Sequence, residues 1–190
     1  MSARPSNSGD WALTAAVLVA VGMGLWGMWR FSENAEANRR EDSARLSRLV
    51  TLSLAGDSAP VVPMRVGADS IAFPTAAALP ALLYVRGPDC PACERMDEAL
   101  EQYLASRRPG EPEVWVTDES GPEALRGRFT AVVGAHVMRP IEPVAFARGY
   151  KVEAVPFIAL IDAGSRVKSV RVGYVDGFEV RHFLAGRPNS

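Results

Sequence analysis

The sequence predicts an α/β domain, a central sheet flanked by helices, preceded by a single transmembrane helix and a short helical stalk. Three observations lead to this prediction. Residues 11–29 carry no charged side chain, and the chain beyond residue 56 alternates short apolar runs with amphipathic segments. The two cysteines form one C-x-x-C where a predicted strand meets a predicted helix. The predicted order is a tail at 1–10, an anchor at 11–29, a stalk or linker at 30–55 and a domain at 56–190.

The uncharged run at 11–29 lies between Asp10 and Arg30. At helical rise it spans about 28 Å, close to the hydrocarbon thickness of a bilayer. Trp11 lies at one end and Trp29 at the other, as an aromatic belt requires. A cleaved signal peptide is the alternative, because residues 35–37 have the small-x-small form of a cleavage site. The run exceeds a usual signal core of about 7–15 residues, so we expect a retained anchor.

Composition excludes several classes of protein. A formal net charge of -1 gives no electrostatic case for nucleic acid binding, and 48% hydrophobic residues exclude wholesale disorder. A structural zinc site usually needs four ligands, whereas this chain has one cysteine pair and two distant histidines. The absence of a C-x-x-C-H sequence excludes covalently attached c-type haem. We therefore expect no bound cofactor and no metal.

Within the predicted domain, periodicity and turn residues mark each element. The helix at 91–104 is well defined, because Met96, Leu100 and Leu104 share one face and Pro91 suits the first turn. The expected elements are a hairpin at 61–66 and 70–73, a buried strand at 81–85, the helix at 91–104, a strand at 113–117, a helix at 122–129, a helix at 143–148, a strand at 157–161, a turn at 162–165 leading into a strand at 166–172, and a helix at 177–184.

The segment Cys90-Pro91-Ala92-Cys93 follows the apolar strand and opens the helix. At a helix N-terminus, free backbone N–H groups and the helix dipole stabilise an anion. Cys90 is thereby favoured as a thiolate, which is the form that attacks disulfides. Cys93 lies one turn further along the same face, where it can attack a mixed disulfide on Cys90. The spacing predicts a redox pair; half of an intermolecular zinc site and an inert pair are the alternatives.

Several ordered motifs in residues 56–186 match one family. They are Gly-Asp-Ser-Ala-Pro at 56–60, the apolar strand before the C-x-x-C, Tyr-Lys-Val-Glu-Ala-Val-Pro at 150–156, Ile-Asp-Ala-Gly at 161–164, and Val-Gly at 172–173. This part of the chain resembles the thioredoxin-like superfamily, most closely its membrane-anchored TlpA/MauD-like thiol–disulfide oxidoreductases. The resemblance implies a thioredoxin-like fold and a redox-active centre.

The resemblance also implies roles for single residues. Cys90 would be the nucleophile and Cys93 the resolving thiol. Pro156 would be a cis-proline that leaves the backbone of Val155 free to bind a substrate strand; a trans proline opening an edge strand is the alternative. The partners implied are protein thiols and disulfides, together with a redox-regenerating partner in the membrane.

Two positions depart from the family pattern. Asp89 stands where the family often has Trp, and Tyr84 stands where thioredoxins often have a buried acid, six positions before the first cysteine. A carboxylate at Asp89 should raise the pKa of Cys90, because it opposes the developing thiolate. Asp89 and Glu94 are the nearest candidates for modulating that pKa and for proton transfer. The direction of electron flow stays open.

We therefore expect a membrane-tethered thiol–disulfide oxidoreductase that acts on exported proteins or in the maturation of redox proteins. A Cu(I)-handling metallochaperone using the cysteines with His136 is one alternative, and a non-catalytic assembly subunit is another. Five arginines between 30 and 48 favour a cytoplasmic domain by the positive-inside rule. Disulfide chemistry belongs outside the cytoplasm, so we expect a single-pass protein of the bacterial cytoplasmic membrane with a periplasmic domain.

Overall fold

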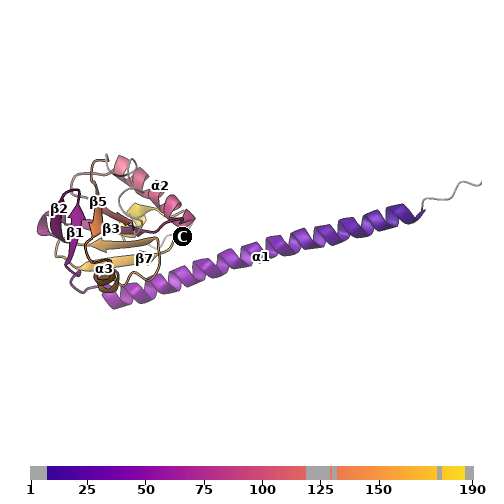
Figure 1. Cartoon of the computed structure of the whole chain (residues 1–190), viewed down its shortest axis with the longest axis horizontal. Helices are drawn as coiled ribbons and strands as arrows, with labels where there is room; N and C mark the ends of the chain where they lie inside the picture. Colours follow the sequence, from indigo (N-terminus) through magenta and orange to yellow (C-terminus); the bar gives the residue numbers. More distant parts are fainter. Residues whose placement is uncertain (1–7, 119–128, 130–131, 175–176, 187–190) are drawn as a thin grey trace, which may run out of the picture. The chain divides into compact units, whose positions relative to one another are not determined.

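The computed structural model describes residues 8–118, 129, 132–174 and 177–186. The chain divides into two units, Met1–Asp42 and Ser43–Ser190. Helix α1 (Ser8–Leu54) is continuous through the residues predicted as anchor and stalk (Figure 1). The remaining strands and helices all belong to the second unit.

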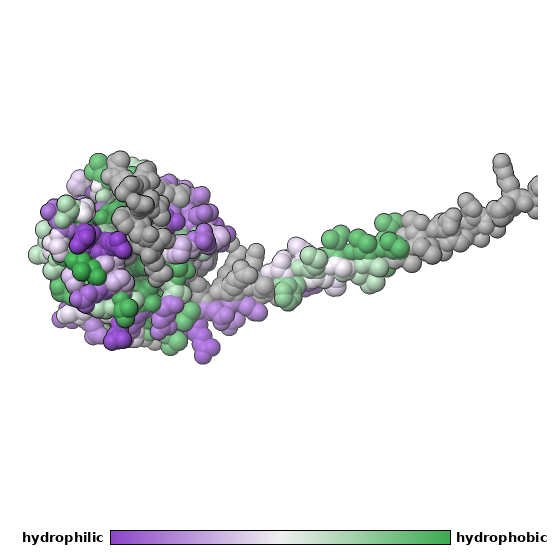
Figure 2. Space-filling model, in the orientation of Figure 1, coloured by the Kyte–Doolittle hydropathy of each residue, from purple (hydrophilic) through white to green (hydrophobic). Residues whose placement is uncertain are grey.

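Most side chains of α1 between residues 17 and 31 are apolar, and this stretch is largely green in Figure 2, with paler atoms among the green. Each large apolar side chain in this stretch is more than half exposed; the least exposed, Val17 and Val21, are 52% exposed. In the part of the chain that the structure describes, no helix is both long enough and apolar enough to cross a membrane.

The end of α1 belongs to the second unit and packs into its core. Val50 and Leu54 are 4% and 5% exposed. The Ser47 hydroxyl donates to the carbonyl oxygen of Val172 at 3.0 Å and accepts from the backbone N–H of the same residue at 2.8 Å. These contacts tie residues ahead of the predicted domain start at 56 to the last strand of the sheet.

Among the described residues the second unit is built on a sheet in the order β2-β1-β5-β4-β3-β6-β7. β4 is parallel to β3 and to β5, and every other neighbouring pair is antiparallel. The strands are β1 (Val62–Val66), β2 (Asp69–Phe73), β3 (Ala81–Arg86), β4 (Glu113–Asp118), β5 (Ala135–Pro140), β6 (Phe157–Ile161) and β7 (Val167–Val172). The predicted hairpin and the other predicted strands are confirmed, whereas β5 was not predicted.

Helices cover both faces of the sheet. α2 (Pro91–Ala105) and α4 (Val180–Leu184) pack on one face, which we call the α2 face. α3 (Pro143–Tyr150) and the end of α1 pack on the other, the α3 face. The predicted helices at 91–104 and 143–148 are confirmed. The last helix begins at Val180 instead of 177, because Gly177 has φ +74°, outside the helical region. The predicted helix at 122–129 lies outside the described residues except for Phe129.

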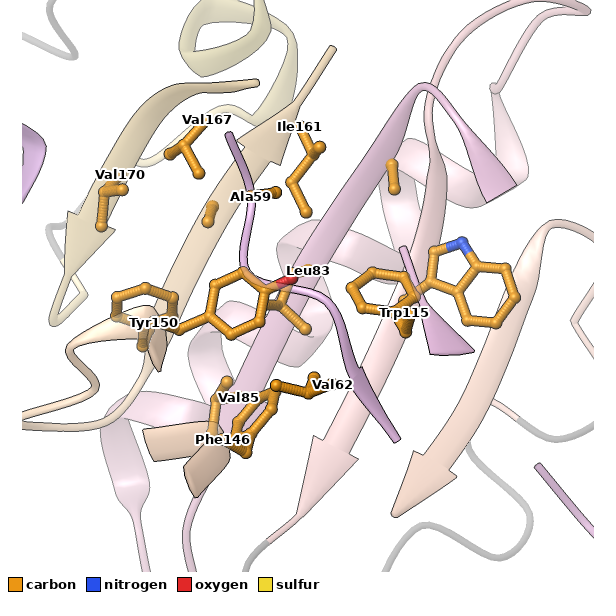
Figure 3. Close-up of a cluster of buried hydrophobic side chains, with 14 of the residues drawn as sticks. Ala59, Val62, Leu83, Val85, Trp115, Phe146, Tyr150, Ile161, Val167 and Val170 are labelled. Atoms are coloured by element: carbon orange, nitrogen blue, oxygen red, sulfur yellow. The ribbon is translucent and has the colours of Figure 1, made fainter. Parts of the chain in front are cut away.

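Consecutive residues of β3 alternate between the two faces. Leu82 and Tyr84 join the cluster under α2, whereas Leu83 and Val85 join the cluster under α3. Figure 3 shows the second cluster, in which Phe146 and Tyr150 of α3 lie over Leu83 and Val85. Because β3 is buried on both faces, its sequence is a continuous apolar run.

Candidate active site

The two cysteines lie where β3 gives way to α2. Cys90 is the N-cap residue, with extended backbone, and Pro91 takes the first helical position. The Cys93 N–H donates to the Sγ of Cys90 at 3.1 Å and to its carbonyl oxygen at 2.9 Å. Cys90 and Cys93 form a disulfide, with Cα atoms 5.2 Å apart. The structure therefore brings the predicted pair together at the positive end of the helix dipole.

The two cysteines differ in their exposure to solvent. Cys90 is half-buried, whereas Cys93 is fully buried. Cys90 is therefore the more accessible of the two cysteines. This asymmetry is what a nucleophile followed by a resolving thiol requires.

Asp89 and Glu94 lie beside Cys90 in the chain, but both are exposed. Asp89 has φ +45°, a left-handed conformation that aspartate tolerates better than most residues. Glu94 lies in the first turn of α2, and its N–H donates to the Cys90 carbonyl oxygen at 3.2 Å. Water and salt screen exposed charges, so the predicted influence of these carboxylates on Cys90 stays a prediction.

Val155 and Pro156 precede β6 and lie at the end of the sheet where β3 finishes. Phe157 pairs with Val85 in the antiparallel β3–β6 ladder, so Pro156 lies where β3 leads on toward Cys90. The Val155–Pro156 peptide bond is cis, as the resemblance implied. The carbonyl oxygen of Pro156 accepts from the Gly173 N–H at 2.7 Å. A substrate-binding role for Val155 and Pro156 stays a prediction.

A cavity of about 220 Å³ lies at the ends of β3 and β4. Val85 and Thr117 form its sheet side, and Phe146 and Val152 contribute apolar walls. Arg139 also lines it. The cavity can accept an apolar side chain near a positive charge.

No protein-family model matches this sequence, and no curated protein matches it either. Solved structures do match its fold. The thioredoxin domain of a thiol-disulfide oxidoreductase from Bacteroides vulgatus has a TM-score of 0.53 at 12% identity, over 63% of this chain and 89% of that chain. The chain has a thioredoxin-like fold.

Two further structures with this fold have names that refer to disulfide chemistry. A thio-disulfide isomerase from Thermus thermophilus has a TM-score of 0.54 at 14% identity, over 70% of this chain and 98% of that chain. A thiol-disulfide isomerase from Corynebacterium glutamicum has a TM-score of 0.50 at 20% identity, over 67% of this chain and 94% of that chain. The thioredoxin-like domain thus carries a Cys90–Cys93 pair on a fold shared with thiol–disulfide oxidoreductases.

The sequence analysis did not single out one buried carboxylate on the helix that carries Cys93. Asp97, one turn beyond Cys93 on α2, is fully buried. The Tyr84 hydroxyl lies 2.7 Å from Asp97 Oδ1 and 3.1 Å from the Cys93 carbonyl oxygen. Arg86 Nη1 lies 3.6 Å from Asp97 Oδ2. The available signal was a carboxylate on the same helix face as Met96 and Leu100, both fully buried.

His136 lies on β5 and stacks on Trp115, with ring centroids 4.1 Å apart. Its Nε2 is 2.7 Å from Glu113 Oε2. Trp115 belongs to the cluster of the α3 face, whereas Cys93 lies in the first turn of α2, on the opposite face. No group of three His, Cys, Asp or Glu side chains placed to hold a metal occurs among the described residues. His136 thus packs on Trp115 and Glu113 and not on the cysteine pair.

Proposed function

We propose that the protein is a thiol–disulfide oxidoreductase that acts on cysteine pairs of exported proteins or of maturing redox proteins. The observation that carries this proposal is the Cys90–Cys93 disulfide at the N-terminus of α2, with Cys90 accessible and Cys93 buried. The same arrangement can oxidise a dithiol or, once reduced, cleave a disulfide.

In the reducing direction, the Cys90 thiolate attacks one sulfur of a substrate disulfide. A bond forms between Cys90 and that sulfur, and the other substrate sulfur leaves as a thiolate. Cys93 then attacks Cys90, forms the intramolecular disulfide and releases the second substrate thiol. Two electrons pass from the cysteine pair to the substrate, and no bound cofactor takes part. A second thiol–disulfide protein in the membrane must return the pair to its starting state.

The end of β3, which leads to Cys90, lies beside groups that could bind a substrate. In our proposal the backbone of Val155, next to Pro156, binds an extended substrate segment. The cavity lined by Val85 and Phe146 takes an apolar side chain from the same region of the substrate. This gives affinity for a strand that presents a disulfide without requiring one fixed sequence.

The proposed location is the outer face of the bacterial cytoplasmic membrane, with residues 11–29 as a single anchor. The support is the uncharged run bounded by Asp10 and Arg30, with Trp11 and Trp29 at its ends. Alkaline phosphatase fused after Ser190 should be active, because that reporter folds only outside the cytoplasm. An inactive phosphatase fusion with a bright fluorescent-protein fusion at the same site would place the domain inside.

Trapping of the mixed disulfide tests the proposed reaction in the full-length chain. Cys93→Ser removes the resolving thiol, so adducts on Cys90 should accumulate as higher bands on a non-reducing gel of membranes. Cys90→Ser removes the nucleophile, so these adducts should be absent. The double variant Cys90→Ser with Cys93→Ser controls for background bands, and reductant should collapse every specific band.

The proposed reaction fails if Cys90→Ser and Cys93→Ser are equally free of adducts and both retain wild-type exchange activity. An assembly role for the thioredoxin-like domain would then replace it. Mass spectrometry of the trapped bands would identify the substrate class where the proposal holds.

A further inference from the structure

Two arginines lie opposite each other on neighbouring strands of the sheet. In the antiparallel ladder of β1 and β5, Arg65 pairs directly with Arg139. Side chains in this relation project from the same face of the sheet, and like charges there destabilise the strand pairing. Both residues are exposed, and no acidic side chain among the described residues forms an ion pair with either of them. The stability of the fold therefore does not explain this pair of arginines.

The arginine pair lines a cavity, which we call the arginine cavity. Its volume is about 320 Å³, and Pro140, Ile141 and Pro143 also line it. Each proline holds its own φ near about −65°. The Ile141 N–H donates to the Pro63 carbonyl oxygen at 3.0 Å, which fixes the chain between β5 and α3. A preformed cavity with two guanidinium groups suits a carboxylate, which accepts paired hydrogen bonds from arginine.

The arginine cavity adjoins the apolar cavity at the ends of β3 and β4. The two cavities share Arg139, Pro140 and Pro143, and the apolar one is also lined by Val85 and Phe146. Neighbouring side chains of an extended segment point in opposite directions. An apolar residue and the acidic residue next to it can therefore enter the two cavities together.

The arginine cavity lies at the end of the sheet that leads to Cys90. β3, β4 and β5 are parallel, and their register places Arg139 level with Arg86, the last residue of β3. Met64 and Met138 belong to the cluster of the α3 face, so the arginines next to them project from the α2 face. β3 and β5 are two strand spacings apart, about 10 Å, which about three residues of an extended chain span.

We propose that the arginine cavity is a docking site for an extended segment of the substrate protein in which an acidic residue neighbours an apolar one. The acidic carboxylate binds Arg65 and Arg139, and the apolar side chain enters the cavity lined by Phe146. The bound carboxylate offsets the repulsion within the arginine pair, so docking selects for negative charge. This inference rests on the proposed thiol–disulfide exchange, and it predicts that substrates carry an acidic residue a few positions from the reacting cysteine.

Binding of a cysteine-free peptide to the full-length chain in its disulfide form tests the site without a redox step. The probe is a short fluorescent peptide of serine and threonine that contains one Leu-Glu pair, and two companion peptides carry Leu-Gln or Ala-Glu instead. Fluorescence anisotropy measures the dissociation constants. Loss of the carboxylate or of the leucine should each weaken binding on the order of tenfold. Added salt should reduce the difference between the Leu-Glu and Leu-Gln peptides.

Variants of the arginine pair test which residues bind the carboxylate. Arg139→Gln should weaken binding of the Leu-Glu peptide on the order of tenfold and leave the Leu-Gln peptide unchanged, because the two changes remove the same interaction. Arg65→Gln should act in the same direction. Lys168→Gln is the matched control, because it removes an exposed cation from β7, which the sheet order separates from β1 and β5. It should leave the binding of every peptide unchanged.

Urea unfolding gives a second readout, which separates a docking role from a structural one. Because the arginines repel each other, Arg139→Gln should raise the unfolding midpoint while it weakens peptide binding. A lower midpoint would mean that Arg139 supports the fold itself, and would overturn the site. Equal weakening by Lys168→Gln, no saturable binding of the Leu-Glu peptide, or equal competition by free acetate would also overturn it.

An exchange experiment separates the failure of this inference from the failure of the proposed function. The reduced full-length chain is mixed with disulfide-linked peptides in which Leu-Glu or Leu-Gln begins about three positions from the cysteine. Wild type should react faster with the Leu-Glu peptide, whereas Arg139→Gln should react equally fast with both. Equal rates in wild type would overturn the role of the site in exchange. If neither peptide reacts, the proposed function fails, and the docking site is then decided by the binding measurements alone.

Discussion

The two faces of the sheet are both densely packed, but they differ in the polar groups that they bury. On the α3 face, the Tyr150 hydroxyl donates to the carbonyl oxygen of Pro60 at 2.9 Å, and burial raises the pKa of this tyrosine. On the α2 face, the Tyr84 hydroxyl donates to the buried carboxylate of Asp97, one turn beyond Cys93 on α2. One tyrosine stabilises a loop, whereas the other supports a charge. The two buried tyrosine hydroxyls therefore differ in the charge of the group that each one contacts.

Removal of the end of α1 should produce the largest effect on the α3 face. A chain lacking residues 1–55 loses Val50 and Leu54 from the core, at about 1.5–3 kcal/mol for each buried side chain. That loss is a large part of the stability of a typical domain, about 5–15 kcal/mol. Urea unfolding of this chain should show a much lower midpoint than a chain lacking only residues 1–42. Equal midpoints would mean that the end of α1 adds nothing to the domain.

Removing one buried hydroxyl from each face gives an intermediate effect. Tyr84→Phe should lower the free energy of unfolding by about 1.5–3 kcal/mol, because its partner Asp97 is charged. Tyr150→Phe should lower it by about 0.5–1.5 kcal/mol, because its partner is a neutral carbonyl. Equilibrium urea unfolding measures both. If Tyr150→Phe costs more than Tyr84→Phe, the distinction between the faces does not hold.

Ser47→Ala should have a smaller effect, about 1 kcal/mol, because it removes the hydroxyl that binds both backbone groups of Val172. Ser53→Ala is the matched control on the same helix. Among the described residues its hydroxyl donates to the Val50 carbonyl oxygen three residues back, a bond within the helix, so its loss should leave the unfolding free energy nearly unchanged. Thermal unfolding of the two variants side by side measures the difference, and equal shifts would contradict a role for Ser47 at the sheet edge.

The smallest effect concerns alkaline pH. Burial and the nearby Glu111 raise the pKa of Tyr103 to about 12. Its unfolded value is near 10, so the folded state holds this proton more tightly. The resulting stability is complete below pH 10 and is lost as pH rises from about 10 toward 12. Wild type should therefore lose more stability between pH 9 and about 11.5 than Tyr103→Phe; parallel curves in urea unfolding would refute this assignment.

The strands and helices that could be predicted each show a pattern of apolar residues within their own segment. β3 is an uninterrupted apolar run, and α2 repeats buried residues at Met96, Leu100 and Leu104. β5 lacks such a pattern, because His136, Arg139 and Pro140 interrupt it. Its place between β1 and β4 depends on residues distant in sequence, with His136 covered by Trp115 and Glu113. Local periodicity cannot report partners of this kind.

The candidate site also contains residues that the sequence predicts and one residue that it does not. Cys90 and Cys93 were predictable because a C-x-x-C at the start of a predicted helix indicates thiol–disulfide chemistry. Asp97 was not, because a charged residue between helical neighbours is ordinarily solvent-exposed. Its place on the same helix face as Leu100 is a weak signal, whereas its contacts with Tyr84 and Arg86 come from the neighbouring strand. A sequence without its strand-to-helix contacts gives no sign of that network.

The pairing of β1 with β5 sets an order for folding during synthesis. Met64 pairs with Pro140, and β3, α2 and β4 all leave the ribosome between these two strands. The hairpin of β1 and β2 can form early, because its contacts are local, but Met64 and Phe73, both fully buried in the finished protein, have no sheet to join until β5 emerges. The nascent chain therefore carries the apolar side chains of this hairpin uncovered while β3, α2 and β4 are synthesised, and exposed apolar strands of this kind favour aggregation.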